Sequence, residues 1–190
     1  MCGITVLIRQ YVKEKYPEMT VTEVRDLVNQ LCMSTATIAL DTKGNPYSPR
    51  KQGAGIADIK KSTTTGAYLY VDGIGKTKLE LGDDPTRSGV YTMTINLKNI
   101  SDKALSFALG NITMTESISE SEPEYVAEMA YLLSNSAEYS AEGGTITNNV
   151  LTVDGGKTAK VTITLKLSAE DKSYLNSTFA NGMYVEGFLT

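Results

Sequence analysis

The stretches GVYTMTINLKNIS (residues 89–101) and AKVTITLKLS (residues 159–168) decide the fold. Apolar and polar side chains alternate along both of them. The apolar faces consist of Tyr91, Met93, Ile95 and Leu97 in the first stretch and of Val161, Ile163, Leu165 and Leu167 in the second. Alternation with a period of two predicts strands that bury one face and expose the other. We therefore expect two half-buried antiparallel strands.

Shorter stretches of the same kind surround these two. We expect further strands in AYLYV (67–71), TKLEL (77–81), ALSFAL (104–109), NNVLTV (148–153) and MYVEGFL (183–189). Turn-forming clusters separate them: GDDPTRSG (82–89), NISDK (99–103), AEGG (141–144) and NST (176–178). Asp154-Gly155-Gly156 between two strand patterns predicts a hairpin. Frequent turns between half-buried strands indicate an antiparallel β-sandwich.

Residues 1 to about 62 have helical periodicity instead. Ile4, Leu7, Ile8, Tyr11 and Val12 recur at helical spacing before Pro17 ends the pattern. A second helix begins with a capping box of Thr20 and Glu23 and a hydrophobic staple of Met19 and Val24. Its apolar stripe consists of Val24, Leu27, Val28, Leu31 and Cys32. Two such helices bury too little surface to be stable alone, so we expect another partner for their apolar faces.

The region between the two halves of the β pattern is less regular. ESISESEPE (116–124) is acidic and has no apolar face, which predicts a solvated loop. YVAEMAYLLSNSAEYS (125–140) fits either a helix or a pair of strands. We expect extended structure with a short turn.

Composition excludes several kinds of chemistry. Histidine is absent, so neither a Ser-His-Asp arrangement nor a histidine zinc site can form within this chain. Cys2 and Cys32 are the only cysteines, too few for a four-cysteine zinc site. With a net charge of −4, nucleic acid is not an expected partner. No run of about eighteen apolar residues and no signal-peptide pattern occurs, so membrane insertion is not expected either.

The stretch SPRKQGAGIAD (48–58) is the most motif-like part of the chain. It lacks the third glycine of a dinucleotide-binding loop, and no Gly-Lys-Ser/Thr follows as in a phosphate-binding loop. We expect a glycine bend at Gly53 and Gly55 that passes close to neighbouring structure and leads into a short helix over 57–62. Asp83 and Asp84 predict a turn that caps a strand; an acid pair or a calcium site is the alternative.

The order of these segments resembles a known family. MCGITVLIRQY (1–11), with Gly3, Leu7 and Ile8, is similar to the helix that continues from the catalytic serine in subtilisin-like serine proteases. MSTA (33–36) and QGAGIADIKKS (52–62) are similar to the closing segments of that catalytic domain. SGVYTMTINLKNISDKALSF (88–107) and NGMYVEGFLT (181–190) resemble the fibronectin type III-like domain that follows it in cell-envelope subtilases of the lactocepin and complement-degrading kinds.

This resemblance implies an α+β fragment of two parts. Residues 1–65 would be the C-terminal helices of an incomplete subtilisin-like α/β catalytic domain, and residues 66–190 a fibronectin type III-like β-sandwich. The Gly-Thr-Ser motif of the family is missing, which implies that the nucleophile precedes Met1 in a longer parent protein. No catalytic, cofactor-binding or metal-binding residue is assigned in this chain. Ser34, Ser48 and Ser62 have no base beside them in the sequence and are not expected to be nucleophiles.

The function expected from the resemblance is a non-catalytic segment of a secreted or cell-wall-associated serine endopeptidase. The sandwich would act as a spacer or scaffold, or as an exosite for protein substrate. The expected partners are the upstream catalytic core and the protein substrate of the parent. The alternative is a stand-alone adhesive or carbohydrate-binding sandwich, against which stands the absence of tryptophan. Tyr68, Tyr70 and Tyr91 are expected in cores or on sheet faces.

The absence of a catalytic core from this chain also leads to an expectation about association. Without that core, the apolar helix faces should be exposed, which predicts self-association. The side chains expected to mediate it are Leu7, Ile8, Tyr11, Leu27 and Leu31.

Overall fold

The computed structural model describes residues 2–123, 125–179 and 182–190. In this part of the chain, helices come first: α1 (Cys2–Lys15), α2 (Val21–Ser34), α3 (Pro49–Gln52) and α4 (Ile59–Thr64). The first strands are β1 (Ala67–Tyr70), β2 (Val90–Asn99), β3 (Leu105–Ala108), β4 (Asn111–Ile118) and β5 (Val126–Leu132). They are followed by β6 (Asn135–Glu142), β7 (Thr145–Thr147), β8 (Val150–Val153), β9 (Thr158–Leu167), α5 (Ala169–Thr178) and β10 (Glu186–Leu189). The expected α+β architecture with antiparallel sheets is confirmed.

The start of α2 follows the expected capping signals. Thr20 Oγ1 accepts a hydrogen bond from the Glu23 N–H at 3.3 Å, and Glu23 Oε2 accepts one from the Thr20 N–H at 2.7 Å. Both sides of the capping box are therefore present. Met19 packs against the apolar cluster that contains Val24, as the staple requires.

The two long helices bury their apolar faces against each other. Ile8, Val12, Val24, Leu27, Val28 and Leu31 form one buried cluster, to which Tyr68 of β1 adds its ring. Ile8, Leu27 and Leu31 are at most 4% exposed, so the expectation that they mediate self-association is wrong for these three. Helix-helix packing covers them, whereas Leu7, on the outer side of α1, remains 51% exposed.

One layer of the sandwich is a four-stranded sheet in the order β1-β2-β9-β6. Its centre is the antiparallel pair β2 and β9, in which Met93 lies opposite Ile163 and Ile95 opposite Val161. These side chains are all less than 9% exposed, which confirms the apolar faces expected from the alternation. The β5–β6 region is extended, as expected.

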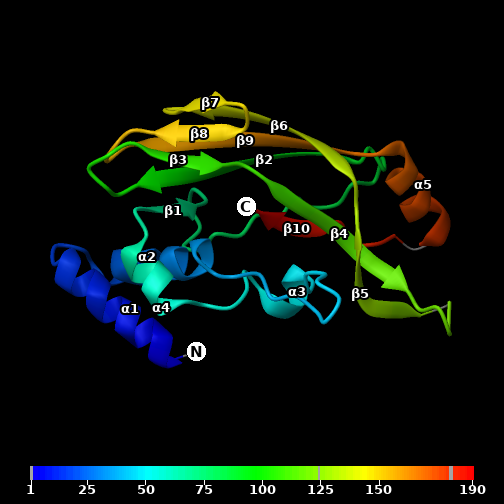
Figure 1. The fold of residues 1–190 in the computed structure, drawn as a ribbon, viewed down its shortest axis with the longest axis horizontal. Helices are drawn as coiled ribbons and strands as arrows, with labels where there is room; N and C mark the ends of the chain where they lie inside the picture. The colour runs from blue at the N-terminus through cyan, green and yellow to red at the C-terminus, as the bar shows by residue number, and fades with distance from the viewer. Residues whose placement is uncertain (1, 124, 180–181) are drawn as a thin grey trace.

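The other layer consists of two three-stranded sheets, β3-β8-β7 and β10-β4-β5. Only residues 109–110 separate β3 from β4, so the chain passes directly between the two sheets of this layer. Only residues 133–134 separate β5 from β6, and there the chain passes into the four-stranded layer. Leu151 and Val153 of β8 pack against Val161 and Ile163 of β9 in a shared core. Figure 1 shows the layers, with α1, α2 and α4 below β1.

The prediction of a hairpin at residues 154–156 is wrong. Asp154-Gly155-Gly156 does reverse the chain, but β8 pairs with β3 and β7, whereas β9 pairs with β2 and β6. The connection therefore joins the two layers of the sandwich. A Cβ at Gly155 would collide with the backbone of Asp102, so glycine is required where the connection crosses the 101–103 turn.

Other boundaries also differ from the expectation. TKLEL (77–81) is not a strand, because the Thr77 hydroxyl bonds the Leu69 carbonyl (2.8 Å) where a backbone ladder would form. The acidic stretch is a loop only from Ser119, since β4 extends to Ile118. The turn expected at 176–178 is the end of α5.

Helix α5 closes one end of the sandwich. Its Asp171 is 4% exposed and accepts hydrogen bonds from the Ser134 N–H and the Ser168 hydroxyl, both at 2.7 Å. Tyr174 stacks on Tyr131 of β5 with ring centroids 4.1 Å apart. Among the described residues, no helix has the length and apolarity needed to cross a bilayer.

Candidate functional site

The glycine bend brings the segment after α3 against the segment after α2. Gly53 has φ 65° and Gly55 has φ 120°, conformations that favour glycine. A Cβ at Gly55 would collide with the Thr37 carbonyl. Ile56 and Thr37 exchange two backbone hydrogen bonds, at 2.8 and 2.9 Å. The expected bend against neighbouring structure is confirmed, and α4 begins slightly later than expected, at Ile59 after its cap Asp58.

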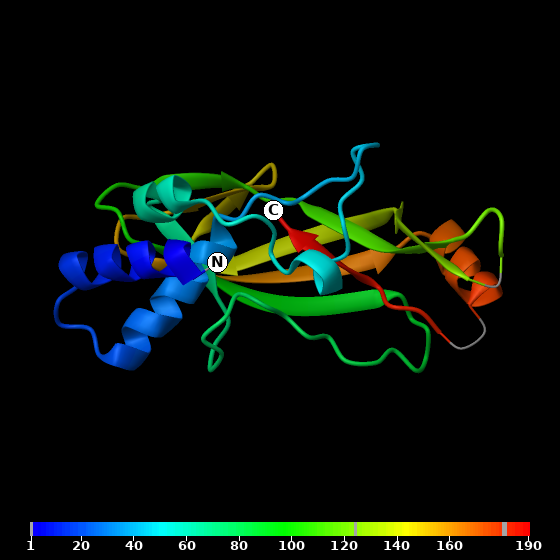
Figure 2. The same ribbon diagram turned by 90° about the horizontal axis from the view of Figure 1, so that it is seen from below.

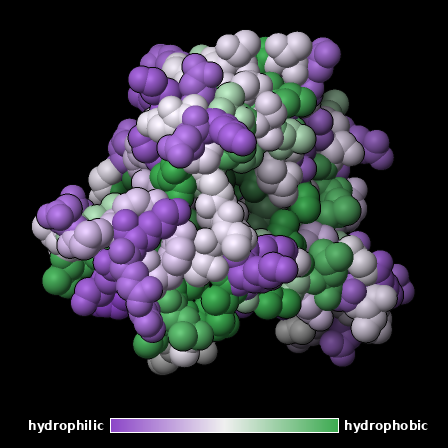
Figure 3. All heavy atoms as spheres, turned by 60° about the vertical axis from the view of Figure 1, so that its left-hand side comes forward, coloured by the Kyte–Doolittle hydropathy of each residue, from purple (hydrophilic) through white to green (hydrophobic). Residues whose placement is uncertain are grey.

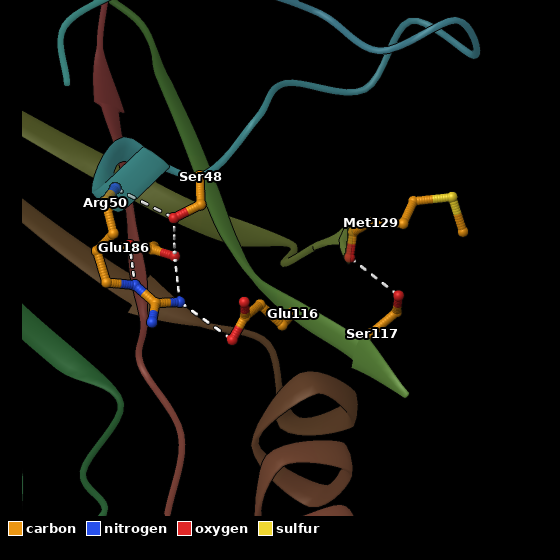
Figure 4. Close-up of polar contacts among 6 residues, drawn as sticks. All are labelled: Ser48, Arg50, Glu116, Ser117, Met129 and Glu186. Carbon is orange, nitrogen blue, oxygen red and sulfur yellow. Dashed lines mark hydrogen bonds and ion pairs between the residues drawn. The ribbon is translucent and has the colours of Figure 1, made fainter. Parts of the chain in front are cut away.

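A polar cluster just before this bend ties the helical part to the sandwich. We call Ser48, Arg50, Glu116, Tyr184 and Glu186 the Arg50 cluster. Arg50 Nε and Nη2 donate to the two carboxylate oxygens of Glu186, both at 2.9 Å. Arg50 Nη2 also lies 3.1 Å from Glu116 Oε2. Figure 4 shows the guanidinium between the two carboxylates, one on β10 and one on β4.

The local structure of α3 positions this guanidinium. Ser48 caps α3: its Oγ accepts from the Arg50 N–H at 3.1 Å and donates to Glu186 Oε1 at 2.8 Å. Pro49 occupies the first turn, where its missing N–H costs nothing. A four-residue helix thus directs Arg50 toward β10, and Figure 2 shows α3 lying beside that strand.

The electrostatics of the cluster favour the paired state. Hydrogen bonds that the guanidinium donates to Glu186, and then to Glu116, raise the pKa of Arg50 above its ordinary value. The side chain of Glu186 is only 12% exposed, and the Arg50 guanidinium lies 4.3 Å from the centroid of the Tyr184 ring. A bidentate pair fixes orientation as well as distance. The cluster can therefore hold the 48–52 segment at one angle to the sandwich.

Only part of the Arg50 cluster could be recognised in the sequence. Ser48-Pro49 is a recognisable helix start, and Arg50 belongs to the motif-like stretch SPRKQGAGIAD (48–58). Nothing local pointed to Glu186, which is 136 residues away from Arg50. Glu116 belongs to a stretch expected to be a solvated loop, so its place in β4 was missed.

Replacing Arg50 by alanine should loosen the 48–56 segment while the sandwich stays folded. Arg50 is 41% exposed, so we expect a loss of about 1 kcal/mol, typical of a partly solvated ion pair, or about fivefold faster local opening. Amide hydrogen exchange of residues 51–56 measures this. Arg25→Ala is the control, because it removes an equal charge from a pair between sequence neighbours. Equal exchange rates in Arg50→Ala and the unchanged chain would show that the cluster fixes nothing.

The serines considered as nucleophiles have structural roles. Ser34 Oγ accepts from the Leu69 N–H at 2.8 Å and lies 3.4 Å from the Leu69 carbonyl, so it caps the outer edge of β1. Ser62 Oγ donates to the Asp58 carbonyl at 2.7 Å and lies 2.8 Å from Thr35 Oγ1. Ser48 belongs to the Arg50 cluster. Each of the three serines thus bonds to different partners.

Asp84 forms the strand-capping turn that was expected. Its carboxylate accepts hydrogen bonds from the Gly89 N–H (2.9 Å) and the Ser88 N–H (3.0 Å), just before β2. These bonds lower its pKa to about 2. Among the described residues, no group of three or more histidine, cysteine, aspartate or glutamate side chains could hold a metal ion.

The Asp84 turn should make stability depend on pH in acid. Because the folded-state pKa of about 2 lies below the ordinary value, this contribution is complete above about pH 4 and lost as pH falls toward 2. The difference in Tm between the unchanged chain and Asp84→Asn should therefore be constant above about pH 5 and shrink below about pH 4. Asp83→Asn removes the same charge beside the turn and should show no such convergence. A difference in Tm that stays constant down to pH 2 would contradict this role.

Other residues considered from the sequence also have packing environments. Cys32 has a free, half-buried thiol, and burial raises its pKa, which disfavours a reactive thiolate. Tyr68 packs against the helical cluster and Tyr91 against the sandwich core, as expected. Tyr70 lies 6.0 Å from Tyr68, ring to ring.

Comparison with known proteins identifies the class to which this sandwich belongs. A model of the Fn3-like domain matches residues 80–190, which is more than half of the chain. The chain therefore belongs to the Fn3-like domain family. This match includes every strand from β2 onward, but not β1. The boundary expected between residues 65 and 66 stays a prediction.

The similarity to curated proteins extends over the whole chain. C5a peptidase of Streptococcus pyogenes serotype M1 is 27% identical over 190 residues, which are 100% of this chain and 15% of that protein. C5a peptidase of serotype M6 (strain ATCC BAA-946 / MGAS10394) matches with the same identity and coverage. The chain thus spans about 15% of the length of the curated relatives it matches. The resemblance to cell-envelope subtilisin-like serine proteases is confirmed.

Proposed function

We propose that this chain is a non-catalytic C-terminal segment of a secreted or cell-wall-associated subtilisin-like serine endopeptidase. In this proposal residues 1–65 complete the catalytic domain, and residues 66–190 form a sandwich that is held rigidly against it as a scaffold. The observation that carries the proposal is the similarity to C5a peptidase, which includes the helices and the sandwich together. A free-standing adhesive sandwich would not need the helical part of that match.

The outer face of α1 supports the proposed contact with an upstream catalytic core. Val6 is 62% and Leu7 51% exposed, and a Cβ at Gly3 would meet nothing within 4 Å. A helix face with a small residue beside two exposed aliphatic residues can pack closely against another element. The inner face of the same helix is already buried on α2, so the outer face is the part that remains for such a core.

The Arg50 cluster and the glycine bend support the scaffold role. Arg50 connects the 48–52 segment to β10 by a bidentate ion pair and to β4 by a second ion pair, with Glu116. Ile56, just after the bend, is connected to the Thr37 backbone by two hydrogen bonds. A linker between independent domains would be exposed and polar, with few contacts. The 48–56 segment of this chain is instead held at its start by the ion pairs of Arg50 and at its end by the hydrogen bonds of Ile56.

The experiment is to express the parent polypeptide and to measure cleavage of casein and of a short chromogenic peptide. We expect activity on both, which is lost when the serine of the upstream Gly-Thr-Ser motif is replaced by alanine. Leu7→Asp in the parent should lower the activity, whereas Arg9→Asp should not, because Arg9 is exposed on a different side of α1. An inactive parent, or an active one whose serine is dispensable, would contradict the proposal.

The same parent separates a scaffold from an exosite. If the sandwich is a scaffold, Arg50→Ala in the parent should lower cleavage of casein and of the peptide by the same factor. If the sandwich is an exosite, Arg50→Ala should lower the cleavage of casein alone, because a short peptide cannot reach a distant surface.

A further inference from the structure

Strand β3 is the free edge of its sheet, whose order is β3-β8-β7. The Leu109 N–H donates to the Asn149 carbonyl at 2.8 Å, on the side of β8. Backbone groups alternate in direction along a strand. The N–H and C=O groups of Ser106 and Ala108 therefore point away from β8, toward the side where the described part of the chain places no strand.

An apolar cavity lies behind this edge. Its volume is about 460 Å³, and its walls include Leu69 of β1, Leu97 of β2 and Ile163 of β9 as well as Phe107 of β3. Figure 3 shows a hollow in the surface with hydrophobic residues inside it and along one side. Phe107 faces the core and yet is only half-buried. The core of the sandwich is thus incompletely filled next to β3.

Strand β10 runs toward the free edge of β3. β10 runs antiparallel to β4, with Leu189 opposite Asn111. Thr190 and Gly110 then exchange two backbone hydrogen bonds, at 2.8 and 2.9 Å. Because only residues 109–110 separate β4 from β3, a chain that continued in this direction would run antiparallel to β3. Its second and fourth residues would lie opposite Ala108 and Ser106.

The free backbone groups of β3 point to the side on which the added strand would lie. Gly110 bonds to Thr190 on that side. Because the direction alternates along the strand, the N–H and C=O groups of Ala108 and Ser106 point to the same side, and those of Leu109 and Phe107 to the other. Leu189 and Phe107 both line the cavity. The first and third residues after Thr190 share their orientation, so their side chains would enter the cavity.

The opposite edge offers no equivalent site. The outer N–H of Leu69 in β1 is bonded by Ser34 Oγ at 2.8 Å, and its carbonyl by Thr77 Oγ1 at 2.8 Å. Hydroxyl groups thus occupy the positions that a neighbouring strand would use there. The edge left for pairing beside the cavity is β3.

We propose that the polypeptide following Thr190 in the longer protein continues β10 as a strand antiparallel to β3, with apolar first and third side chains that fill the cavity. This proposal rests on the proposed function in one respect, namely that the chain is part of a longer protein. The added strand would complete the sandwich by covering an open edge that otherwise invites association.

The test compares the 190-residue chain with a chain extended by the ten residues that follow Thr190 in its gene. Amide hydrogen exchange, followed by NMR, should slow for Ser106 and Ala108 by about tenfold or more in the extended chain. The Leu105 and Phe107 amides, which face β8, serve as internal controls and should be protected in both chains. Aspartate at the first and third added positions should abolish the new protection, whereas aspartate at the second and fourth should not.

Three results would overturn the proposal. Exchange at Ser106 and Ala108 could be equal in the two chains, or the chain could have no residues after Thr190 in its gene. Protection that rises with the concentration of the 190-residue chain would assign the edge to a second copy instead. Protease activity plays no part in this readout. If the Ser106 and Ala108 amides stay unprotected while the parent protein cleaves casein, the added strand is refuted and the proposed function stands. If these amides become protected while the parent protein is inactive, only the proposed function is refuted.

Discussion

Replacing Leu151 by alanine is expected to lower the free energy of unfolding by about 2 to 5 kcal/mol, the range for a large-to-small change in a packed core. Leu151 is fully buried in β8, and Val161 and Ile163 of the facing sheet belong to the same cluster. Its side chain joins the two layers of the sandwich, so alanine leaves a cavity between them. Urea unfolding followed by circular dichroism measures the change.

Val150 provides the control for this experiment. It precedes Leu151 on the same strand, points to the other face and is 37% exposed. Val150→Ala should cost about 1 kcal/mol or less, mainly through strand propensity. If the two variants unfold at the same urea concentration, β8 does not carry the core as described.

Replacing Asn99 by aspartate is expected to cost about 2 to 4 kcal/mol at neutral pH, since it leaves several buried polar groups without partners. Asn99 is fully buried at the end of β2. Its Nδ2 donates to the carbonyls of Lys103 (2.8 Å), Val153 (2.9 Å) and Asp154 (3.2 Å). The carboxylate cannot donate and would direct a negative charge at these three oxygens.

The same substitution should depend on pH in a specific direction. Burial beside carbonyl oxygens raises the pKa of the introduced carboxyl above its unfolded value. A raised acid pKa means that the penalty is smallest below the unfolded value of about 4 and grows as pH rises toward 7. Asn148→Asp, at an exposed turn residue with φ 50°, is the control and should show neither the loss nor this dependence. A neutral effect of Asn99→Asp at pH 7 would contradict the role of Asn99 as the joint between the layers.

Period-two and period-3.6 patterns predicted most of the elements, because burial on one face is a local property of the sequence. They could not predict which sheet a strand joins. The signal at residues 154–156 identifies a reversal, but the partners of β8 and β9 depend on Asn99 and Asp102, more than fifty residues earlier. Helix α5 was missed for a different reason. Its residues Ala169–Thr178 have little apolar periodicity, and its position depends on the buried Asp171.

Of the candidate site, only the backbone bend at residues 53–55 was predicted from the sequence. The glycines at 53 and 55 indicated a bend because few other residues adopt positive φ. The Arg50 cluster was not predictable, since its members come from α3, β4 and the end of the chain. Contacts between such distant segments leave no local pattern. The exposed face of α1 was expected as a wider stripe, because the mutual packing of α1 and α2 was not anticipated.

We propose above all that this chain belongs to a longer subtilisin-like protease and contributes none of its catalytic residues. The most direct test is the gene sequence immediately upstream of the codon for Met1. We expect a Gly-Thr-Ser-x-Ala-x-Pro motif a few codons before it, with aspartate and histidine motifs further upstream. An open reading frame that begins at Met1, or one preceded by a signal peptide alone, would contradict the claim.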